Sequence, residues 1–472
     1  MQPPLSSNAL SIASTCPFIR QMRFSGFCFS RICTRPHPEA LCRWSYDNVS
    51  YMGRTRPCDT NHHPPSRKME SQQRLSILRQ IPRSVWVLGC VSLLMDVSSE
   101  IIHSLLPMFM FASLGASATT IGLVEGLAEA TAPIVKVFSG ALSDYLRNRK
   151  WLAVTGYALG ALSKPLFAIA PTIGVVVSAR VLDRVGKGIR GAPRDALVAD
   201  VTPPHLRGAA YGLRQSLDTV GAFVGPLVAV GVMLAFSDKY RLAFWLAVIP
   251  GLFAVALLAT GIKEPTHTQK TKGSRGAGPV RWRKLVELGS GYWWVVAIGA
   301  VFSLARFSEA FLILRAMGSG VPPALVPLVM VAMNVVYAFC AYPFGKLADR
   351  FSQTRLLIGG LGVLIAADLV LAQGAHWGFV LAGVALWGMH MGMTQGLLST
   401  MVAHAAPSGS RGTAFGFFNL FSGGVTLLSS ALAGVIWDRV NPAATFYVGA
   451  VFCVAAILLL SFVRLRRLPG TS

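Results

Sequence analysis

Charged residues are scarce in this chain: Asp, Glu, Lys and Arg make up 13% of its 472 residues, against about 25% in a typical soluble domain. Apolar residues make up 53%. This composition argues against a soluble enzyme and against a disordered regulator. A helix that crosses a bilayer needs about 20 mostly apolar residues, and residues 69–472 have room for twelve such helices but not for a further large domain.

Sequence signatures of catalysis and metal binding are also missing. Five of the eight cysteines precede residue 60, and no CxxC pair or other metal-ligand spacing occurs, so neither a disulfide framework nor a zinc site is predicted. Lys187 lies between two glycines but lacks the remainder of a phosphate-binding loop. No hydrolase constellation stands out. We therefore predict no enzymatic activity, no metal and no cofactor, and an ion gradient, carried by protons, as the energy source.

The first 68 residues are rich in Arg, Pro, Ser and Cys and show no sustained periodicity. They lack the charged, apolar and cleavage regions of a secretory signal peptide. Three interpretations stay open: a transit peptide, a basic disordered tail, or a translated upstream extension of a protein that starts at Met69 or, less favoured, Met52. The third is preferred, so we expect 1–68 to be disordered or non-native and assign it no function.

Hydrophobic runs predict an all-α membrane protein with twelve transmembrane helices. The predicted spans are residues 84–112, 119–142, 152–170, 173–192, 208–234, 242–261, 292–314, 322–344, 356–373, 377–402, 412–436 and 443–463.

Basic residues are distributed unevenly between the loops. With the N-terminus inside, the inner segments hold 23 Lys and Arg and the outer segments four. Cytoplasmic loops carry such an excess, so both termini are predicted to be cytoplasmic in a multi-pass inner-membrane protein. The net charge of +23 is then explained by membrane orientation and not by nucleic acid. The basic linker 263–290 separates two six-helix halves, 84–262 and 291–464.

The two halves repeat each other in sequence. Residues 140–144 (GALSD) correspond to 345–349 (GKLAD), and 207–212 (RGAAYG) correspond to 411–416 (RGTAFG), at offsets of 205 and 204. Internal repeats of this kind are typical of secondary transporters, whose site lies between the repeats.

With these motifs the chain resembles the major facilitator superfamily, in a bacterial subgroup of mostly unassigned substrate. The superfamily loop motif, which implies a gating role, is matched in two copies by Gly140, Asp144, Arg149 and Lys150 and by Gly345, Asp349 and Arg350. The superfamily's antiporter motif is matched in part by Gly212, Gly221, Gly225 and Pro226. The resemblance implies two pseudo-symmetric six-helix bundles in the lipid bilayer, a small-molecule substrate and a monomer. Relatives are thought of as exporters of drugs, siderophores or metal ions.

Ionisable residues within the predicted spans are the candidate functional residues, because each costs about 2.5–3.5 kcal/mol at the bilayer centre. Helical periodicity places them in stripes, which we expect to face the bundle interior or one another. Asp96, Glu100 and Glu129 are candidate proton carriers, and Arg184 and Arg306 would supply counter-charge or bind an anionic substrate. Other candidates for coupling or substrate binding are Asp183, Asp218 and Glu309.

Three further expectations concern single residues. Asp144 is expected to approach the N-terminus of a helix in the other half, near Arg411. Asp368 is expected in a structural ion pair, and His390 in a hydrogen-bonded packing role.

The favoured hypothesis is proton-coupled export, by antiport, of a small organic molecule across the cytoplasmic membrane. Proton-coupled import of a siderophore or organic anion is the first alternative, and metal-ion export another. A non-transporting membrane sensor is less favoured, and a membrane enzyme less still.

Overall fold

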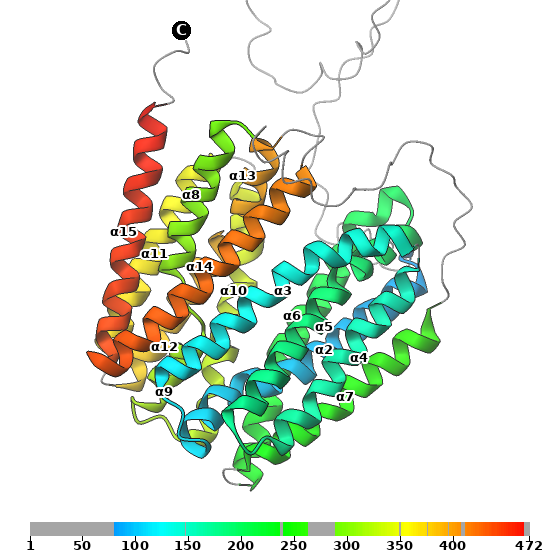
Figure 1. Cartoon of the computed structure of the whole chain (residues 1–472), viewed down its shortest axis with the longest axis horizontal. Coiled ribbons are helices and arrows are strands. Elements are labelled where there is room, and N and C mark those ends of the chain that lie inside the picture. Colours follow the sequence, from blue (N-terminus) through cyan, green and yellow to red (C-terminus); the bar gives the residue numbers. More distant parts are fainter. Residues whose placement is uncertain are drawn as a thin grey trace, which may run out of the picture. The chain divides into compact units, whose positions relative to one another are not determined.

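A computed structural model describes residues 80–146, 148–236, 239–262, 288–348, 351–374, 376–394, 396–406 and 411–466. Within these ranges every regular element is a helix (Figure 1). Residues 1–68 and nearly all of the predicted linker 263–290 lie outside the described residues.

The first half of the described chain forms six long helices. These helices follow the predicted spans closely. The exception is the charged fourth helix, which was predicted to end at residue 192 and continues to Val201. The elements are α2 (Arg83–Met108) with its π-helical extension η2 (Phe109–Ser113), α3 (Ala118–Leu146), α4 (Arg149–Ile169), α5 (Ile173–Val201), the short η3 (Pro204–Leu206), α6 (Arg207–Phe236) and α7 (Tyr240–Gly261).

The second half differs from the prediction at two spans. The seventh and tenth spans, predicted as continuous helices, are each divided in two. The tenth is interrupted at Gly396, whose φ of 78° is a left-handed conformation that favours glycine. The elements are α8 (Ser290–Ala305), α9 (Ala310–Met317), η5 (Pro323–Leu325), α10 (Leu328–Ala348), α11 (Gln353–Ala372), α12 (Trp377–Thr394), α13 (Leu397–Ala405), α14 (Arg411–Arg439) and α15 (Pro442–Arg466).

Length and hydropathy alone single out nine membrane-spanning candidates among the described helices. The candidates omit α3, α5 and α12. Since α3 and α5 carry several ionisable residues, they are too polar to be exposed to lipid all round and must pack their charged faces inside the protein. With these three included, the fold is two bundles of six spans each.

The halves meet along two pairs of helices, α3 with α14 and α6 with α10. The α3–α14 contact is close because small residues line it. A Cβ atom added at Gly122 would lie 2.2 Å from the carbonyl oxygen of Ser430, and one added at Gly434 would lie 2.5 Å from that of Ala118. Glycine therefore lets the two backbones touch, and α3 runs along the opposite half.

Two of the four basic residues predicted in outer segments serve as helix caps. Arg241 donates from Nη2 to the carbonyl oxygen of Ala170 at the end of α4, over 3.0 Å. Arg315 donates to the last carbonyl groups of α11, at Leu371 and Ala372, over 2.9 and 2.8 Å. The two capped helices, α4 and α11, are the third spans of their halves, whereas the capping residues come from the sixth span of the first half and the first span of the second. A local capping role explains why these side chains are basic.

Candidate functional site

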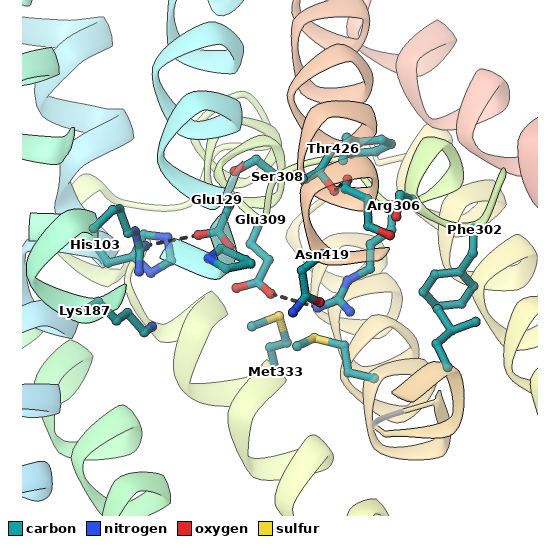
Figure 2. Close-up of a pocket in the computed structure, with 18 of the residues that line it drawn as sticks. His103, Glu129, Lys187, Phe302, Arg306, Ser308, Glu309, Met333, Asn419 and Thr426 are labelled. Carbon is teal, nitrogen blue, oxygen red and sulfur yellow. Dashed lines mark hydrogen bonds and ion pairs between the residues drawn. The ribbon is translucent and has the colours of Figure 1, made fainter. Parts of the chain in front are cut away.

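Two adjoining cavities lie between the halves. The central cavity has a volume of about 420 Å³ and is drawn in Figure 2. The entry cavity has a volume of about 790 Å³ and extends toward the last turns of α3 and α5 and the start of α6. Both volumes fall in the range of small-molecule sites, about 300–1,000 Å³. The side chains that line both cavities are Glu100, Glu129, Pro133, Arg184, Lys187, Ala222, Asn334 and Asn419.

A ladder of ion pairs between α3 and α5 forms one wall. Arg180 Nη2 lies 2.5 Å from Glu125 Oε2, and Arg184 Nη2 lies 3.1 Å from Glu129 Oε1. Each helix presents its two charges four residues apart, so the pairs follow each other along the parallel helices. The pair formed by Glu125 and Arg180 is buried, whereas Glu129 and Arg184 reach the cavities. The predicted stripes on these two spans do face one another.

The two acidic residues of α2, Glu100 and Asp96, differ in the partners that their carboxylates have. Glu100 Oε2 lies 3.4 Å from Nδ1 of His103 on the same helix. Asp96 lines the entry cavity and makes no hydrogen bond or ion pair with any residue that the structure describes. An ionised Asp96 therefore depends on water and on more distant charges for its stabilisation.

The glycines of the antiporter-like motif lie directly behind these two acids. A Cβ atom at Gly221 would lie 2.9 Å from that of Asp96, and one at Gly225 would lie 2.6 Å from that of Glu100. The absence of side chains there lets α6 pack against α2 and fixes the two carboxylates at the cavity. Pro226 is buried within α6, whereas a Cβ at Gly212 would meet no other atom within 4 Å.

Not every predicted residue reaches a cavity. Asp183 Oδ1 accepts a hydrogen bond from Lys164 Nζ over 2.7 Å, and the same ammonium donates to Ser99 Oγ over 3.1 Å. Both charged side chains are almost completely buried and line neither cavity. Asp218 does line the entry cavity, where Arg214 Nη1 holds its carboxylate at 2.6 Å.

The C-terminal half lines the central cavity with residues from the break in the seventh span, between α8 and α9. Arg306 Nη2 and Glu309 Oε1, separated by 3.6 Å, both line the central cavity. The backbone groups that the break releases find hydroxyl partners: the Ser308 amide donates to Ser430 Oγ over 3.1 Å, and Ser429 Oγ donates to the Leu304 carbonyl over 2.8 Å. Irregular backbone at membrane depth needs such partners, and broken helices often line transport sites.

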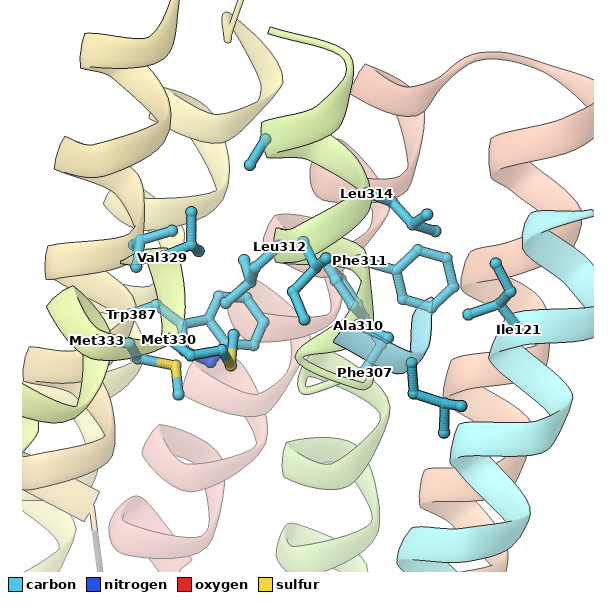
Figure 3. Packing of buried hydrophobic residues seen from close by; sticks show 14 of the residues in the cluster. Ile121, Phe307, Ala310, Phe311, Leu312, Leu314, Val329, Met330, Met333 and Trp387 are labelled. Carbon is cyan, nitrogen blue, oxygen red and sulfur yellow. The ribbon is translucent and has the colours of Figure 1, made fainter. Parts of the chain in front are cut away.

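Aromatic packing also holds this break in place. The ring of Phe307 lies 5.5 Å from that of Phe311 and 5.4 Å from that of Trp387, and Figure 3 shows these side chains around α9. Phe311 and Trp387 are fully buried. Aromatic contacts of Phe307 therefore help to fix the unwound segment, and Phe307, Arg306 and Glu309 all line the central cavity.

The loop-motif residues lie at the end of the bundle to which the entry cavity extends. Arg149 forms an ion pair with Asp200, and Lys150 Nζ lies 5.2 Å from the ring centroid of Trp151. Gly140 packs near Ala192 and Gly345 has no neighbour within 4 Å of an added Cβ. The side chains of Asp144 and Arg411, and both Asp349 and Arg350, lie outside the described residues, so the expected approach of Asp144 to a helix N-terminus stays a prediction.

A hydrogen-bonded latch closes the opposite end of the bundle. Asp438, at the end of α14, accepts hydrogen bonds from the amides of Ala118 and Thr119, over 3.1 and 2.8 Å, and from Thr119 Oγ1 over 2.6 Å. These groups belong to the first turn of α3, where the helix dipole favours an anion. We call this end the closed end, and the end with Lys136 and Arg194 the open end. The sequence analysis did not single out Asp438, because one acidic residue near the end of a helix does not form a recognisable motif.

Two buried residues of the second half were assigned roles from the sequence. Asp368 was predicted to form an ion pair, but the prediction is wrong: it is fully buried and neither carboxylate oxygen has a hydrogen-bonding partner among the described residues. His390 is hydrogen-bonded through Nδ1 to the Gly360 carbonyl at 2.8 Å, and its ring stacks on Phe302. That is the packing role predicted for it. Within the described ranges no three His, Cys, Asp or Glu side chains are grouped so as to hold a metal ion.

Two six-helix bundles around a polar central cavity define a membrane transport protein. The sequence matches the Major Facilitator Superfamily over residues 88–322 and 309–472. A Methanocaldococcus jannaschii protein named "Uncharacterized MFS-type transporter MJ1317" is 31% identical over 396 residues, which are 82% of this chain and 96% of that protein. The chain therefore belongs to the major facilitator superfamily, as the sequence motifs predicted.

More distant proteins share the same fold. The quinolone resistance protein NorA of Staphylococcus aureus is 21% identical over 364 residues, 75% of this chain and 90% of NorA. The crystal structure of the nucleoside transporter NupG superposes with a TM-score of 0.67 at 13% identity, covering 80% of this chain and 99% of that one. At that identity the structural likeness bears on the fold alone.

Proposed function

We propose that this superfamily member is a proton-coupled antiporter that exports a small organic molecule across the cytoplasmic membrane. It would act as a monomer, with both termini in the cytoplasm and no cofactor. The observation that carries the proposal is Asp96, a carboxylate without a partner among the described residues, at the wall of a cavity between two bundles.

Asp96 suits proton binding because its carboxylate has no hydrogen bond or ion pair with any residue that the structure describes. Glu129 is held by Arg184 at 3.1 Å, and Glu100 lies beside His103 at 3.4 Å. A carboxylate that is already paired loses a favourable contact when it is protonated, whereas an unpaired one at a cavity exchanges its proton with water at less cost. Asp96 is therefore the favoured proton carrier, and Glu129 and Glu100 follow it.

The direction of export is supported by three observations. The entry cavity opens at the end with Lys136 and Arg194, which the charge distribution of the loops assigns to the cytoplasm. A substrate would then enter from inside the cell. Relatives include NorA, named for quinolone resistance, and the partial antiporter motif packs α6 behind Asp96.

Proton-coupled import by symport is a second candidate function, and the placement of Asp96 and Lys187 favours it. Asp96 and Lys187 line the same cavity and interact electrostatically. When Asp96 is ionised it partly neutralises Lys187, and when Asp96 is protonated the ammonium is free to attract an anion. On this scheme a proton and an anion bind together, as a symporter requires, whereas an antiporter binds them in turn.

Everted membrane vesicles test the proposal and separate the two candidates. A growth screen of a deletion strain against drugs, metal ions and iron chelates first supplies a compound. Added to respiring vesicles, an exported substrate should dissipate the proton gradient. Asp96→Asn should abolish this response while the protein still reaches the membrane, and Asp96→Glu should retain part of it.

The outcomes are distinct. An unchanged response in both Asp96→Asn and Glu129→Gln would remove the assignment of proton carrier. Accumulation of the compound in the deletion strain favours export, and starvation for it favours import. Failure of every compound to move protons would favour a non-transporting sensor.

A further inference from the structure

The ionisable side chains around the central cavity lie in pairs, with one exception. Glu129 is paired with Arg184, Glu309 with Arg306 and Glu100 with His103, at 3.1, 3.6 and 3.4 Å. Lys187 also lines the cavity but makes no hydrogen bond or ion pair with any residue that the structure describes.

Lys187 is placed to meet a ligand. It lies on α5, three residues after Arg184, and its exposed side chain lines both cavities. Figure 2 shows it among the labelled cavity residues, with no interaction drawn to it. An unpaired ammonium in a partly enclosed cavity attracts an anion more strongly than it would in bulk water.

The approach to Lys187 is basic as well. Arg190 and Arg194 follow it on the same face of α5, and both line the entry cavity, where Arg194 is paired with Asp195 at 3.2 Å. Nη1 of Arg190 is buried without a hydrogen-bonding partner among the described residues. Arg190 therefore adds a positive charge next to Lys187, and positive charge along a cleft raises the local concentration of anions.

The C-terminal half lines the opposite side of the central cavity with polar side chains, such as Arg306 and Asn419, and with apolar ones. The apolar side chains include thioethers and aromatic rings, which adapt to varied apolar shapes and stack on rings. They are Phe302, Phe307, Met330, Met333, Met391 and Phe418.

Asp96 is the acidic cavity residue that opposes this reasoning. It lines the entry cavity with Lys187 and, while ionised, reduces the attraction for an anion. Asp96 is absent from the wall of the central cavity, whereas Lys187 belongs to it. An anion seated in the central cavity therefore meets Lys187 and the paired charges, and Asp96 acts from the side.

We propose that the transported molecule is an amphipathic organic anion whose charged group binds Lys187 and whose apolar part packs against the Met and Phe side chains of the C-terminal half. The inference rests on the proposed function in one respect, that the cavity between the bundles is the substrate site. Arg184 and Arg306 do not serve as the anchor because each already has a carboxylate partner.

Binding of matched ring compounds to the purified full-length protein tests the proposal. The probes are 2-naphthoate, its neutral amide and the corresponding 2-naphthylmethylammonium, followed by phenyl and biphenyl carboxylates, sulfonates and phosphonates. Dissociation constants come from ligand-dependent thermal unfolding. The variants are Lys187→Gln, Lys187→Arg and, as a control that removes one positive charge from an exposed site outside the cavities, Lys239→Gln.

We expect at least one anion to bind about tenfold or more tightly than its matched amide, since a tenfold difference is what about 1.4 kcal/mol of charge attraction gives. Lys187→Gln should lose that preference and keep the amide's affinity, whereas Lys187→Arg and Lys239→Gln should retain it. Tighter binding of the ammonium compound, equal anion binding by Lys187→Gln, or no binding by any anion of the series would each overturn the proposal.

Transport assays separate this inference from the proposed function. If anions bind through Lys187 but no compound moves protons across vesicles, the proposed function fails and the anion site stands. If the protein exports a cation and Lys187→Gln leaves that export unchanged, the transporter assignment stands and the anion site fails.

Discussion

Replacing Asp438 by alanine is expected to release the closed end of the bundle. The carboxylate accepts three hydrogen bonds from the first turn of α3, two from the amides of Ala118 and Thr119 and one from the Thr119 hydroxyl. Loss of a helix N-cap costs about 0.5–2 kcal/mol. Loss of a negative charge at a helix N-terminus costs about 0.3–1 kcal/mol more.

The magnitude follows from the exposure of the site. Asp438 is exposed, so water replaces part of what is lost, and a total of about 1–2 kcal/mol is reasonable for the alanine variant. That free energy favours the state closed at this end by a factor of about 5–30. Asp438→Asn keeps an acceptor but loses the charge, so its effect should be about half as large in free energy.

Spin labels across the closed end measure this shift directly. Cysteines introduced at Lys239 and His376, exposed positions at this end in the two halves, would be labelled in a background without native cysteines. Pulsed dipolar spectroscopy should then show a longer-distance population that grows from wild type through Asp438→Asn to Asp438→Ala. Identical distance distributions in all three proteins, with correct folding, would refute the latch.

Three further outcomes are expected. Lys164→Met should lower the free energy of unfolding by about 3–5 kcal/mol, since it leaves the carboxylate of Asp183 buried and unpaired. Adding Asp183→Leu should restore part of this loss. A double variant as unstable as the single one would contradict the reasoning. Asp368→Asn should unfold at the same temperature as wild type or higher, because a buried carboxyl without partners gains nothing from charge; a large loss of stability would reveal a partner for the charged form. Gly122→Leu should separate α3 from α14 at the carbonyl of Ser430 and lengthen the closed-end distance, whereas an unchanged distance would mean that this contact is not tight.

The fold was predictable because membrane-spanning helices can be identified in a sequence as long apolar runs. The boundaries of α6, α7 and α15 agree with the predicted spans within a few residues. The break between α8 and α9 was not predictable, since residues 304–310 contain neither glycine nor proline. Its cause lies in another helix, where the hydroxyls of Ser429 and Ser430 satisfy the released backbone groups.

The candidate site was predictable in part, for the same reason. Charges four residues apart on α3 and α5 had to face one another, and they do. Helical periodicity does not state which member of a stripe reaches a cavity. Asp96 and Asp183 were both candidate site residues in the sequence, yet Asp183 is buried against Lys164 and Asp96 is left unpaired at the entry cavity. That distinction depends on the packing between helices.

The central claim is that Asp96 carries the coupled proton. Its most direct consequence is that proton binding at Asp96 opens one end of the bundle and closes the other, which two label pairs in lipid nanodiscs test. One pair spans the closed end as above, and the other joins Leu142 of α3 to Gly345 of α10 across the open end. Lowering the pH from 8 to 5 should lengthen one distance while it shortens the other, and Asp96→Asn should abolish the response. Distances that change in the same sense, or a pH response that persists in Asp96→Asn, would contradict the account.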